Sequence, residues 1–338
     1  MRRTVGWLLG LCTMAAFTGS VGAAGPTATK HEPTTGRQRV GVLERVNVLL
    51  TGSRTFQYPG ATYVKVHLTG DATVSDARGG QVQRPGNGWA LSVEGDTAVV
   101  RGFGVRVDRV AHGTKPLRRT ESVCGGDEKV DAVCFRSSDP EAYYRSKAVA
   151  RLLINGVELC TAWRVGPQNR LLTNNHCFTD TRTARDTEVW FNYMCAACGG
   201  FDVYRSTKVW ADQVLATSEV LDYTLFTVSD FAAISRFGYL ELDLRRPARG
   251  EELYIPQHPS GDPTSIAMGG SCGVDNPSYD GYDVATDISY YCDTEGGSSG
   301  SPVLLKSSDK VVALHHFGGC PNSGVRVDLV YQEIAKLI

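Results

Sequence analysis

The stretch TEGGSSGSP, residues 294–302, is the part of the chain that most strongly indicates its fold. Glycine stands two residues before Ser299 and directly after it, so the backbone can turn sharply and leave the hydroxyl exposed. In such a turn the main-chain N–H groups of Gly297 and Ser299 point to one spot, which predicts an oxyanion hole beside a nucleophile. Flexible linkers also contain runs of glycine and serine, so this interpretation needs partners elsewhere in the sequence.

Two upstream stretches supply those partners. TNNHC at 173–177 follows two leucines, so we expect a strand that leads directly to His176. LDYTLFTV at 221–228 places Asp222 at the start of an alternating apolar strand, where an acid can be buried. We therefore predict a triad in which Ser299 attacks a carbonyl, His176 takes and returns the proton, and Asp222 orients the histidine.

Composition bounds the class of protein. With 338 residues the chain is long for one domain and sufficient for two. A net charge of −1 gives no electrostatic argument for binding nucleic acid or an anionic membrane, so neither is expected as a partner. Short alternating runs broken by Gly, Asn, Asp and Pro predict a mainly β structure. Nothing in the composition indicates an oligomeric state.

The N-terminus has the features of a secretory signal peptide over residues 1–24. Two arginines precede an apolar stretch at 5–17, and the small residues VGAA at 21–24 offer a cleavage site. The apolar stretch is short for a membrane-spanning helix, and no other segment could cross a membrane. We therefore expect a secreted protein, extracellular or periplasmic.

The rest of the chain divides by composition. Residues 25–39 are polar and predict a flexible leader, and 40–111 form a cysteine-free block of alternating strands typical of a small β-sandwich, which could serve as a propeptide. A basic linker with Pro and Gly follows at 112–120. Residues 121–338 have the size of two six-stranded barrels, and the apolar spacing over 329–338 predicts a terminal helix.

The chain contains ten cysteines, of which Cys12 lies in the signal peptide, leaving nine. In an exported protein this number implies disulfides, and an odd count leaves one thiol free or in an intermolecular bond. The CAAC sequence at 195–198 and the pair His315-His316 could suggest zinc. Two cysteines without a second matching pair do not make a structural zinc site, so no metal and no cofactor are expected.

These motifs resemble those of the chymotrypsin-fold, trypsin-like serine proteases. The order His176, Asp222, Ser299 is the order of that family, and the sequences around His176 and Ser299 are similar to those of the bacterial lysyl endopeptidase group. The region 37–110 looks like the leading domain of other exported bacterial trypsin-like proteases. The resemblance implies a double six-stranded antiparallel β-barrel and a secreted serine endopeptidase that cleaves proteins or peptides through an acyl-enzyme.

The disulfides follow partly from position and partly from the resemblance. Cys160 and Cys177 bracket the strand that leads to the catalytic histidine, so we expect them to be paired. The other expected pairs are Cys272–Cys292, Cys134–Cys198 with Cys195 as a competitor, and, by analogy with the lysyl group, Cys124–Cys320.

The residue before the nucleophile differs from trypsin. Ser298 stands where trypsin carries the aspartate that pairs with the new N-terminus after activation, and the lysyl group also lacks that acid. Asp293 lies six residues before the nucleophile, where trypsin has its pocket acid, and Asp328 lies near the place where the lysyl enzymes have theirs. The resemblance therefore implies cleavage after Lys or Arg, with Asp293 favoured and without a ranking of Lys against Arg.

The strand expected over 314–319 would bind substrate backbone as an added antiparallel strand, with His315 and Gly318 as candidate contact residues. Neighbours on a strand face opposite ways, so the sequence leaves open whether His315 or His316 faces the site.

Two other functions remain open on the sequence. The first is a dormant or inactive protease fold that acts as a secreted binding protein through its N-terminal β domain. The intact triad argues against an inactive site and not against a dormant one. The second is an esterase that uses the same triad.

Overall fold

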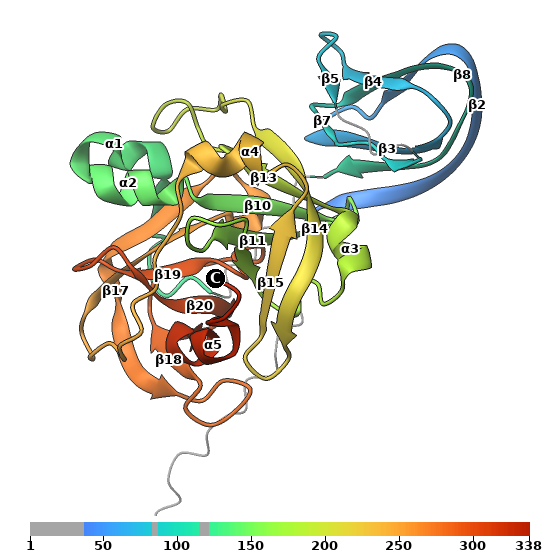
Figure 1. The fold of residues 1–338 in the computed structure, drawn as a ribbon. Coiled ribbons are helices and arrows are strands. Elements are labelled where there is room, and N and C mark those ends of the chain that lie inside the picture. The colour runs from blue at the N-terminus through green and yellow to red at the C-terminus, as the bar shows by residue number, and fades with distance from the viewer. Residues whose placement is uncertain (1–36, 83–86, 115–121) are drawn as a thin grey trace, which may run out of the picture. The chain divides into compact units, whose positions relative to one another are not determined.

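The computed structural model describes residues 37–82, 87–114 and 122–338. The expected signal peptide, nearly all of the expected leader and most of the linker lie outside the described residues. Strands dominate the described chain and form three sheets, each of seven strands (Figure 1).

Six strands of the first sheet form a closed antiparallel barrel. Their order is β11-β10-β13-β14-β15-β12, and pairing of β11 with β12 closes the ring. Every residue of β10 and β13 is buried, because the barrel interior and neighbouring elements cover both faces of these strands. The strands are β10 (Val149–Ile154), β11 (Glu158–Arg164), β12 (Leu171–Thr173), β13 (Thr187–Phe191), β14 (Thr207–Ser218) and β15 (Tyr223–Val228).

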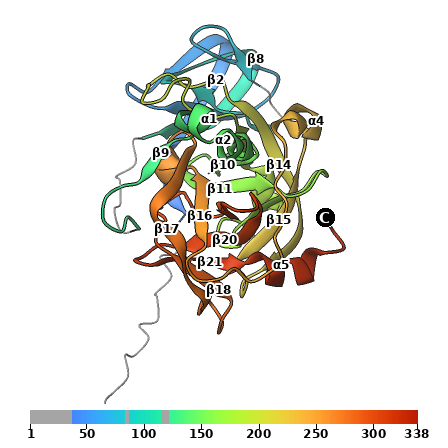
Figure 2. The ribbon, with the colours of Figure 1, turned by 90° about the vertical axis from the view of Figure 1, so that its left-hand side faces the viewer.

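Six strands of the second sheet close in the same way. Their order is β16-β19-β20-β21-β18-β17, with β16 paired to β17 and the short β9 (Lys129–Asp131) added to β17 (Figure 2). The strands are β16 (Glu252–Gln257), β17 (Ser265–Tyr279), β18 (Asp287–Tyr290), β19 (Pro302–Leu305), β20 (Val311–Phe317) and β21 (Asn322–Arg326). The predicted chymotrypsin-like fold with two six-stranded antiparallel barrels is confirmed.

The two barrels share one hydrophobic core. Trp163 and Leu225 of the first barrel belong to the same buried cluster as Tyr254, Leu304 and Val325 of the second. Residues at the facing ends of strands from both barrels can therefore meet at the seam between them.

The helices are short. The chain enters α2 through Asp139, whose side chain accepts a hydrogen bond from the Ala142 N–H, and proline follows at the first helical position. The predicted terminal helix is α5, and its Val330 and Ile334 are buried in the shared core. Among the described helices, none is both long and apolar enough to span a membrane. The helices are η1 (Ala132–Cys134), α1 (Phe135–Ser138), α2 (Pro140–Ser146), α3 (Thr181–Arg185), α4 (Phe231–Ile234), η2 (Ser235–Phe237), η3 (Pro259–Gly261) and α5 (Val327–Ile334).

The third sheet, here called the N-terminal sheet, contains strands β2 to β8. The two longest strands, β2 and β8, pair along their length, and β8 also pairs with β3 and β4 (Figure 1). The strands are β2 (Gly41–Gln57), β3 (Tyr63–Thr69), β4 (Thr73–Asp76), β5 (Gln81–Val82), β6 (Gly88–Trp89), β7 (Val93–Glu94) and β8 (Thr97–Gly113). The strand before them, β1 (Gln38–Arg39), pairs with β11 of the first barrel instead.

Buried charges join the N-terminal sheet to the first barrel. Lys65 lies 2.7 Å from Glu188, and both side chains are 0% exposed. The Ser92 N–H and hydroxyl donate to the two oxygens of Glu188 at 2.8 and 2.7 Å, and Lys208 donates to the Ser92 carbonyl at 2.9 Å. Burial alone would raise the pKa of Glu188, but the charges of Lys65 and Lys208 outweigh it and hold this pKa below its usual value.

Four disulfides cross-link the described residues of the two barrels and of the segment before them, and the four predicted pairs are confirmed. They are Cys124–Cys320, Cys134–Cys198, Cys160–Cys177 and Cys272–Cys292. Cys195 is the cysteine left unpaired in the described chain, and it is buried. No cysteine lies in the N-terminal sheet, so within the described ranges the disulfides join residues that follow it.

Candidate active site

The predicted base and its orienting acid lie together at the seam between the barrels. His176 Nδ1 is 2.8 Å from Asp222 Oδ2, and the His176 N–H donates to Asp222 Oδ1 at 2.9 Å. Asp222 has a φ of +42°, a conformation that costs energy for a non-glycine residue, and the Asn174 amide holds it by donating to its carbonyl at 2.9 Å. Such strain is often found at functional sites.

Asp222 is kept ionised by its neighbours. It is 1% exposed, and burial alone would raise the pKa of its carboxyl. The charge and hydrogen bond of His176, with a second contribution from His316, outweigh burial and hold this pKa well below its usual range. A charged Asp222 fixes the tautomer of His176 that has its proton on Nδ1, leaving Nε2 as the base.

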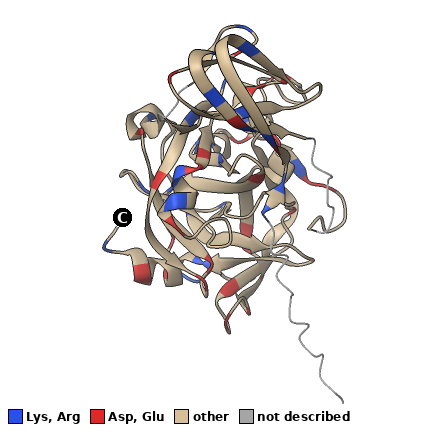
Figure 3. Cartoon of the chain, turned by 90° about the vertical axis from the view of Figure 1, so that its right-hand side faces the viewer, with Lys and Arg blue, Asp and Glu red and all other residues tan. Residues whose placement is uncertain are grey.

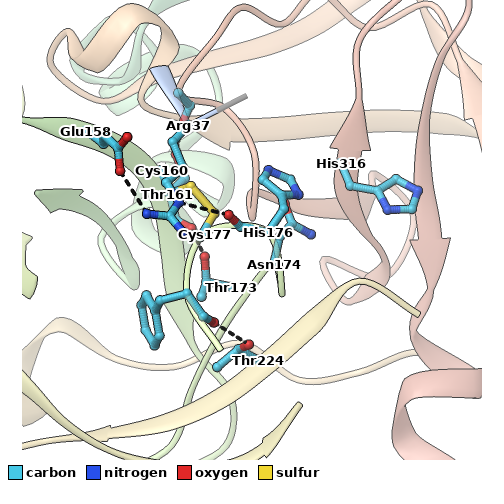
Figure 4. Close-up of a disulfide and its surroundings, with 12 residues drawn as sticks. Arg37, Glu158, Cys160, Thr161, Thr173, Asn174, His176, Cys177, Thr224 and His316 are labelled. Carbon is cyan, nitrogen blue, oxygen red and sulfur yellow. Dashed lines mark hydrogen bonds and ion pairs between the residues drawn. A yellow bond between two sulfur atoms is a disulfide. The ribbon is translucent and has the colours of Figure 1, made fainter. Parts of the chain in front are cut away.

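The second ring nitrogen of His176 has different surroundings from Nδ1. Nε2 of His176 is buried and has no hydrogen-bond partner among residues 37–82, 87–114 and 122–338. The Cys160–Cys177 disulfide ties the residue after the histidine to β11 (Figure 4). Since catalytic hydrogen bonds are often long in the absence of substrate, an unpartnered Nε2 is compatible with a base that takes the nucleophile's proton.

The predicted nucleophile loop lies between β11 and β20. The Ser299 carbonyl accepts from the Thr161 N–H of β11 at 2.8 Å, and the Gly300 N–H donates to the His315 carbonyl of β20 at 2.9 Å. A side chain on Gly300 would put its Cβ 2.2 Å from the Thr161 carbonyl oxygen, so only glycine fits this approach. Ser299 itself stays partly exposed.

The peptide before Gly297 has a fixed orientation. The Ser260 N–H donates to the Gly296 carbonyl at 2.7 Å, and the Thr161 hydroxyl donates to the Gly297 carbonyl at 2.9 Å. Gly297 has a φ of +95°, which favours glycine. Because N–H and C=O point opposite ways across a trans peptide, the bond from Ser260 turns the Gly297 N–H away from that contact, as an oxyanion donor requires.

Ser298 secures this loop without a pairing N-terminus. Its buried hydroxyl donates to Gln257 Oε1 at 2.5 Å and accepts from the Glu295 N–H at 3.2 Å. The Gln257 amide in turn donates to the Asp293 carbonyl at 2.8 Å. A glutamine on β16 therefore braces the loop at the position where trypsin uses a charge pair.

Both predicted pocket acids have partners within the chain. Asp293 is 1% exposed and accepts main-chain N–H bonds from Cys124 at 2.9 Å and from Glu128 at 2.7 Å. Asp328 forms a bidentate pair with Arg326, with N···O distances of 3.1 and 2.5 Å. Neither carboxylate is left without a hydrogen-bond donor.

The two adjacent histidines of β20 have different surroundings, as alternation on a strand requires. His315 is buried and lies 2.8 Å from the Tyr290 hydroxyl, and burial lowers its pKa to about 3. Gly318, directly after β20, packs against Ser122, whose hydroxyl would be 2.0 Å from a Cβ placed there.

His316 contacts Asp222, and the sequence left open which of the two histidines faces the site. Its Nδ1 is 3.2 Å from Asp222 Oδ2 and its Nε2 is 2.6 Å from Asp287 Oδ2. Burial alone would lower the pKa of His316, but the charges and hydrogen bonds of Asp287 and Asp222 outweigh it and raise this pKa to about 9. A charged His316 therefore lies between two carboxylates, and its Nδ1 contacts the same Asp222 oxygen as His176 does.

The site offers no ready metal ligands. Within the described ranges, the one cluster with donor atoms close enough for an ion is Cys160, His176 and Cys177. Its two sulfurs are bonded to each other, so they are not available as thiolate ligands.

Comparison with known proteins gives a family match over part of the chain. Residues 160–314 match the family described as "Trypsin-like peptidase domain". A curated relative, "Secreted RxLR effector protein 73" of Plasmopara viticola, is 37% identical over 216 residues, covering 61% of this chain and 53% of the relative. The chain thus spans about half the length of the curated relative that it matches.

Solved structures with a similar fold include proteases. The inactive form of the Rv3671c protease of M. tuberculosis has a TM-score of 0.47 and 14% identity, covering 64% of this chain and 98% of that one. A Glu endopeptidase in complex with MPD has a TM-score of 0.46 and 19% identity, covering 64% of this chain and 100% of that one. Over residues 160–314 the chain is thus similar to trypsin-like peptidase domains, and its two barrels have the chymotrypsin-like arrangement.

Proposed function

We propose that the chain is a secreted serine endopeptidase that hydrolyses peptide bonds through an acyl-enzyme formed on Ser299. The observation that carries the proposal is the 2.8 Å contact between His176 and Asp222, with His176 Nε2 unpartnered in the described chain. The nucleophile loop lies in direct main-chain contact with β11, to which the residue after His176 is cross-linked.

In the proposed reaction the Ser299 hydroxyl attacks the scissile carbonyl while His176 Nε2 accepts its proton. The oxygen becomes negative and receives hydrogen bonds from the Gly297 and Ser299 N–H groups. Loss of one such donor typically costs about 3 kcal/mol of barrier. His176 then protonates the leaving amine, and water hydrolyses the acyl-enzyme by the reverse sequence. Asp222 stabilises the imidazolium formed in each step.

Cleavage after Lys or Arg is the finer part of the proposal. It is supported by the position of Asp293, six residues before the nucleophile. Each carboxylate oxygen has two lone pairs, so Asp293 can accept from a substrate cation in addition to the N–H groups of Cys124 and Glu128. Asp328 already pairs with Arg326, so its contribution should be smaller.

Secretion is supported by the signal-peptide pattern over 1–24, by the four disulfides and by the printed name of the Plasmopara viticola relative, which is a secreted effector. A second candidate is a dormant or inactive protease fold that acts as a secreted binding protein through its N-terminal β domain, and the word "effector" in that name is compatible with it. The two candidates differ in whether Ser299 reacts.

Labelling with a fluorophosphonate distinguishes them, because this probe reacts only with an activated serine. We expect stable labelling of the secreted protein, loss of labelling in Ser299→Ala, and normal labelling in Ser53→Ala, which changes an exposed serine of the N-terminal sheet. Peptide and ester substrates measured on the same samples separate a peptidase from an esterase. A folded wild-type protein that is not labelled contradicts the proposed activity.

A further inference from the structure

The strand β1 lies on an edge of the first barrel. Gln38 pairs with Leu159 and Arg39 with Glu158, antiparallel to β11. The closing strand β12 pairs only with the far end of β11, at positions 163 and 164. The first residues of β11 would otherwise present a free edge, to which an extended peptide can add as a strand.

This edge leads to the catalytic residues. Thr161, further along β11, donates its N–H to the Ser299 carbonyl at 2.8 Å. Cys160 lies just before it and is cross-linked to Cys177, the residue after His176. A strand added at the start of β11 therefore has one end near the nucleophile and the other end farther from it.

β1 runs in the direction expected for the leaving half of a substrate, which is the part of the peptide after the cleaved bond. Because the pairing is antiparallel, moving back from Arg39 to Arg37 advances along β11 from Glu158 toward Thr161. The N-terminal end of this segment is thus nearest to the nucleophile, and the following residues lead away from it. The residues after a cleaved bond run in the same sense, because the first of them carries the nitrogen that leaves.

Side-chain contacts fix the segment at this place. Arg37 Nε donates to the His176 carbonyl at 3.1 Å, and its Nη1 lies 2.8 Å from Glu158 (Figure 4). Gln38 packs against the residue before the oxyanion donor: a Cβ on Gly296 would lie 2.2 Å from Gln38 Oε1. Arg37 and Gln38 therefore contact both the base and the nucleophile loop.

We propose that Arg37 and Gln38 of the chain itself occupy the edge of β11 along which the leaving half of a peptide substrate would run, and that Glu158 makes Arg or Lys the favoured first residue of that half. The assignment to a substrate rests on the proposed peptidase function. Glu158 and the His176 carbonyl both accept hydrogen bonds and suit a guanidinium or an ammonium. An anionic side chain there would meet the charge of Glu158.

Self-occupancy has a consequence for activity. An extended substrate must displace Arg37 and Gln38, and a segment tethered to the protein competes at an effective concentration of the order of millimolar. A fluorophosphonate has no peptide leaving half, so it needs no such displacement. The two kinds of substrate therefore report on different parts of the site.

The first experiment removes the occupant by charge repulsion in the full chain. In Arg37→Glu we expect kcat/KM on a quenched peptide that extends four residues past the cleaved bond to rise several-fold, while the rate of fluorophosphonate labelling stays within about twofold. Arg37→Glu combined with Glu158→Lys should restore the low rate, because the pair is re-formed with its charges exchanged. Arg249→Glu breaks a 2.9 Å ion pair with Asp275 in the second barrel and should change neither rate.

The second experiment measures which first residue after the cleaved bond the site prefers. Peptides that differ only in the first residue after the cleaved bond, Arg, Gln or Glu, are compared on Arg37→Glu and on Glu158→Lys. The Arg37 and Glu158 side chains are 36% and 31% exposed, so water screens their interaction. We therefore expect kcat/KM to differ only about two- to fivefold from one peptide to the next. Arg37→Glu should prefer Arg, and Glu158→Lys should prefer Glu.

Three results would overturn the inference: equal hydrolysis of the extended peptide by wild type and Arg37→Glu, no restoration in the double variant, or a preference that ignores the charge at position 158. Absence of labelling in all samples would instead refute the proposed activity. In that case, anisotropy of a dye-labelled peptide RQRVG decides the inference without chemistry. Binding to Arg37→Glu and not to wild type supports an occupied site, and equal binding contradicts it.

Discussion

Replacing Asp287 by asparagine should make the stability of the protein depend less on pH. Asp287 lies 2.6 Å from His316 Nε2, and asparagine keeps its size while removing its charge. The Ser323 hydroxyl, which donates to Asp287 at 2.8 Å, can still donate to the asparagine oxygen. The substitution therefore tests the charge of the contact more than its shape.

The size of the effect follows from the pKa of His316. This pKa is raised from 6.5 to about 9, a difference that corresponds to about 3 kcal/mol. A raised pKa stabilises the folded state fully below pH 6.5, and the contribution is lost as the pH rises through 9. Without Asp287 the pKa of His316 falls, so Asp287→Asn should lose about 2 to 3 kcal/mol near pH 6 and less than about 1 kcal/mol above pH 9.5.

Urea unfolding at about pH 6 and pH 9.5 measures this difference. Both proteins should carry Ser299→Ala to prevent self-digestion and should keep their disulfides oxidised. Asp275→Asn serves as the control, because Asp275 pairs with an exposed Arg249 and such pairs contribute at most about 1 kcal/mol. A loss of stability in Asp287→Asn that is the same at both pH values would refute a charged His316.

Three further outcomes are expected. Lys65→Met removes the cation that pairs with Glu188 and should lower the free energy of unfolding by about 3 kcal/mol, with part of the loss recovered in Lys65→Met/Glu188→Gln, which removes the unpaired charge and keeps an acceptor for the Ser92 N–H. Gly300→Ala forces a Cβ within 2.2 Å of a β11 carbonyl and should reduce fluorophosphonate labelling at least about 100-fold while circular dichroism still shows a folded protein. On Lys and Arg substrates, Asp293→Ser should lower kcat/KM far more than Asp328→Ser, and a wild-type preference for Phe or Ala would contradict the proposed pocket.

The double barrel and the four disulfides could be predicted because their signals are local or follow a family pattern. A histidine directly before a cysteine, and a serine between glycines, each define a short stretch whose geometry depends on few neighbours. In the structure, the predicted histidine His176 and the predicted acid Asp222 are in contact. The roles of His176, Asp222 and Ser299 remain predictions until variants are measured.

Other contacts depend on register across a sheet and could not be predicted. Alternation shows that His315 and His316 face opposite ways, but it does not show that Asp287 of β18 lies across from one of them. Likewise, the sequence shows that Ser298 replaces the aspartate of trypsin. It does not show that Ser298 binds Gln257, which lies 41 residues earlier in the chain. The expected leader ends in a strand because Gln38 and Arg39 pair with Leu159 and Glu158, which lie 121 and 119 residues later in the sequence.

The distribution of cysteines has a consequence for a chain cut in the linker over 112–120. Every disulfide among the described residues lies after this linker, so none of these bonds would connect the two fragments. The ion pair of Lys65 with Glu188 and the hydrogen bond from Tyr63 to the Gly156 carbonyl would still hold them together. A nicked molecule should therefore elute as one particle on gel filtration, yet separate into two bands in detergent even without reductant.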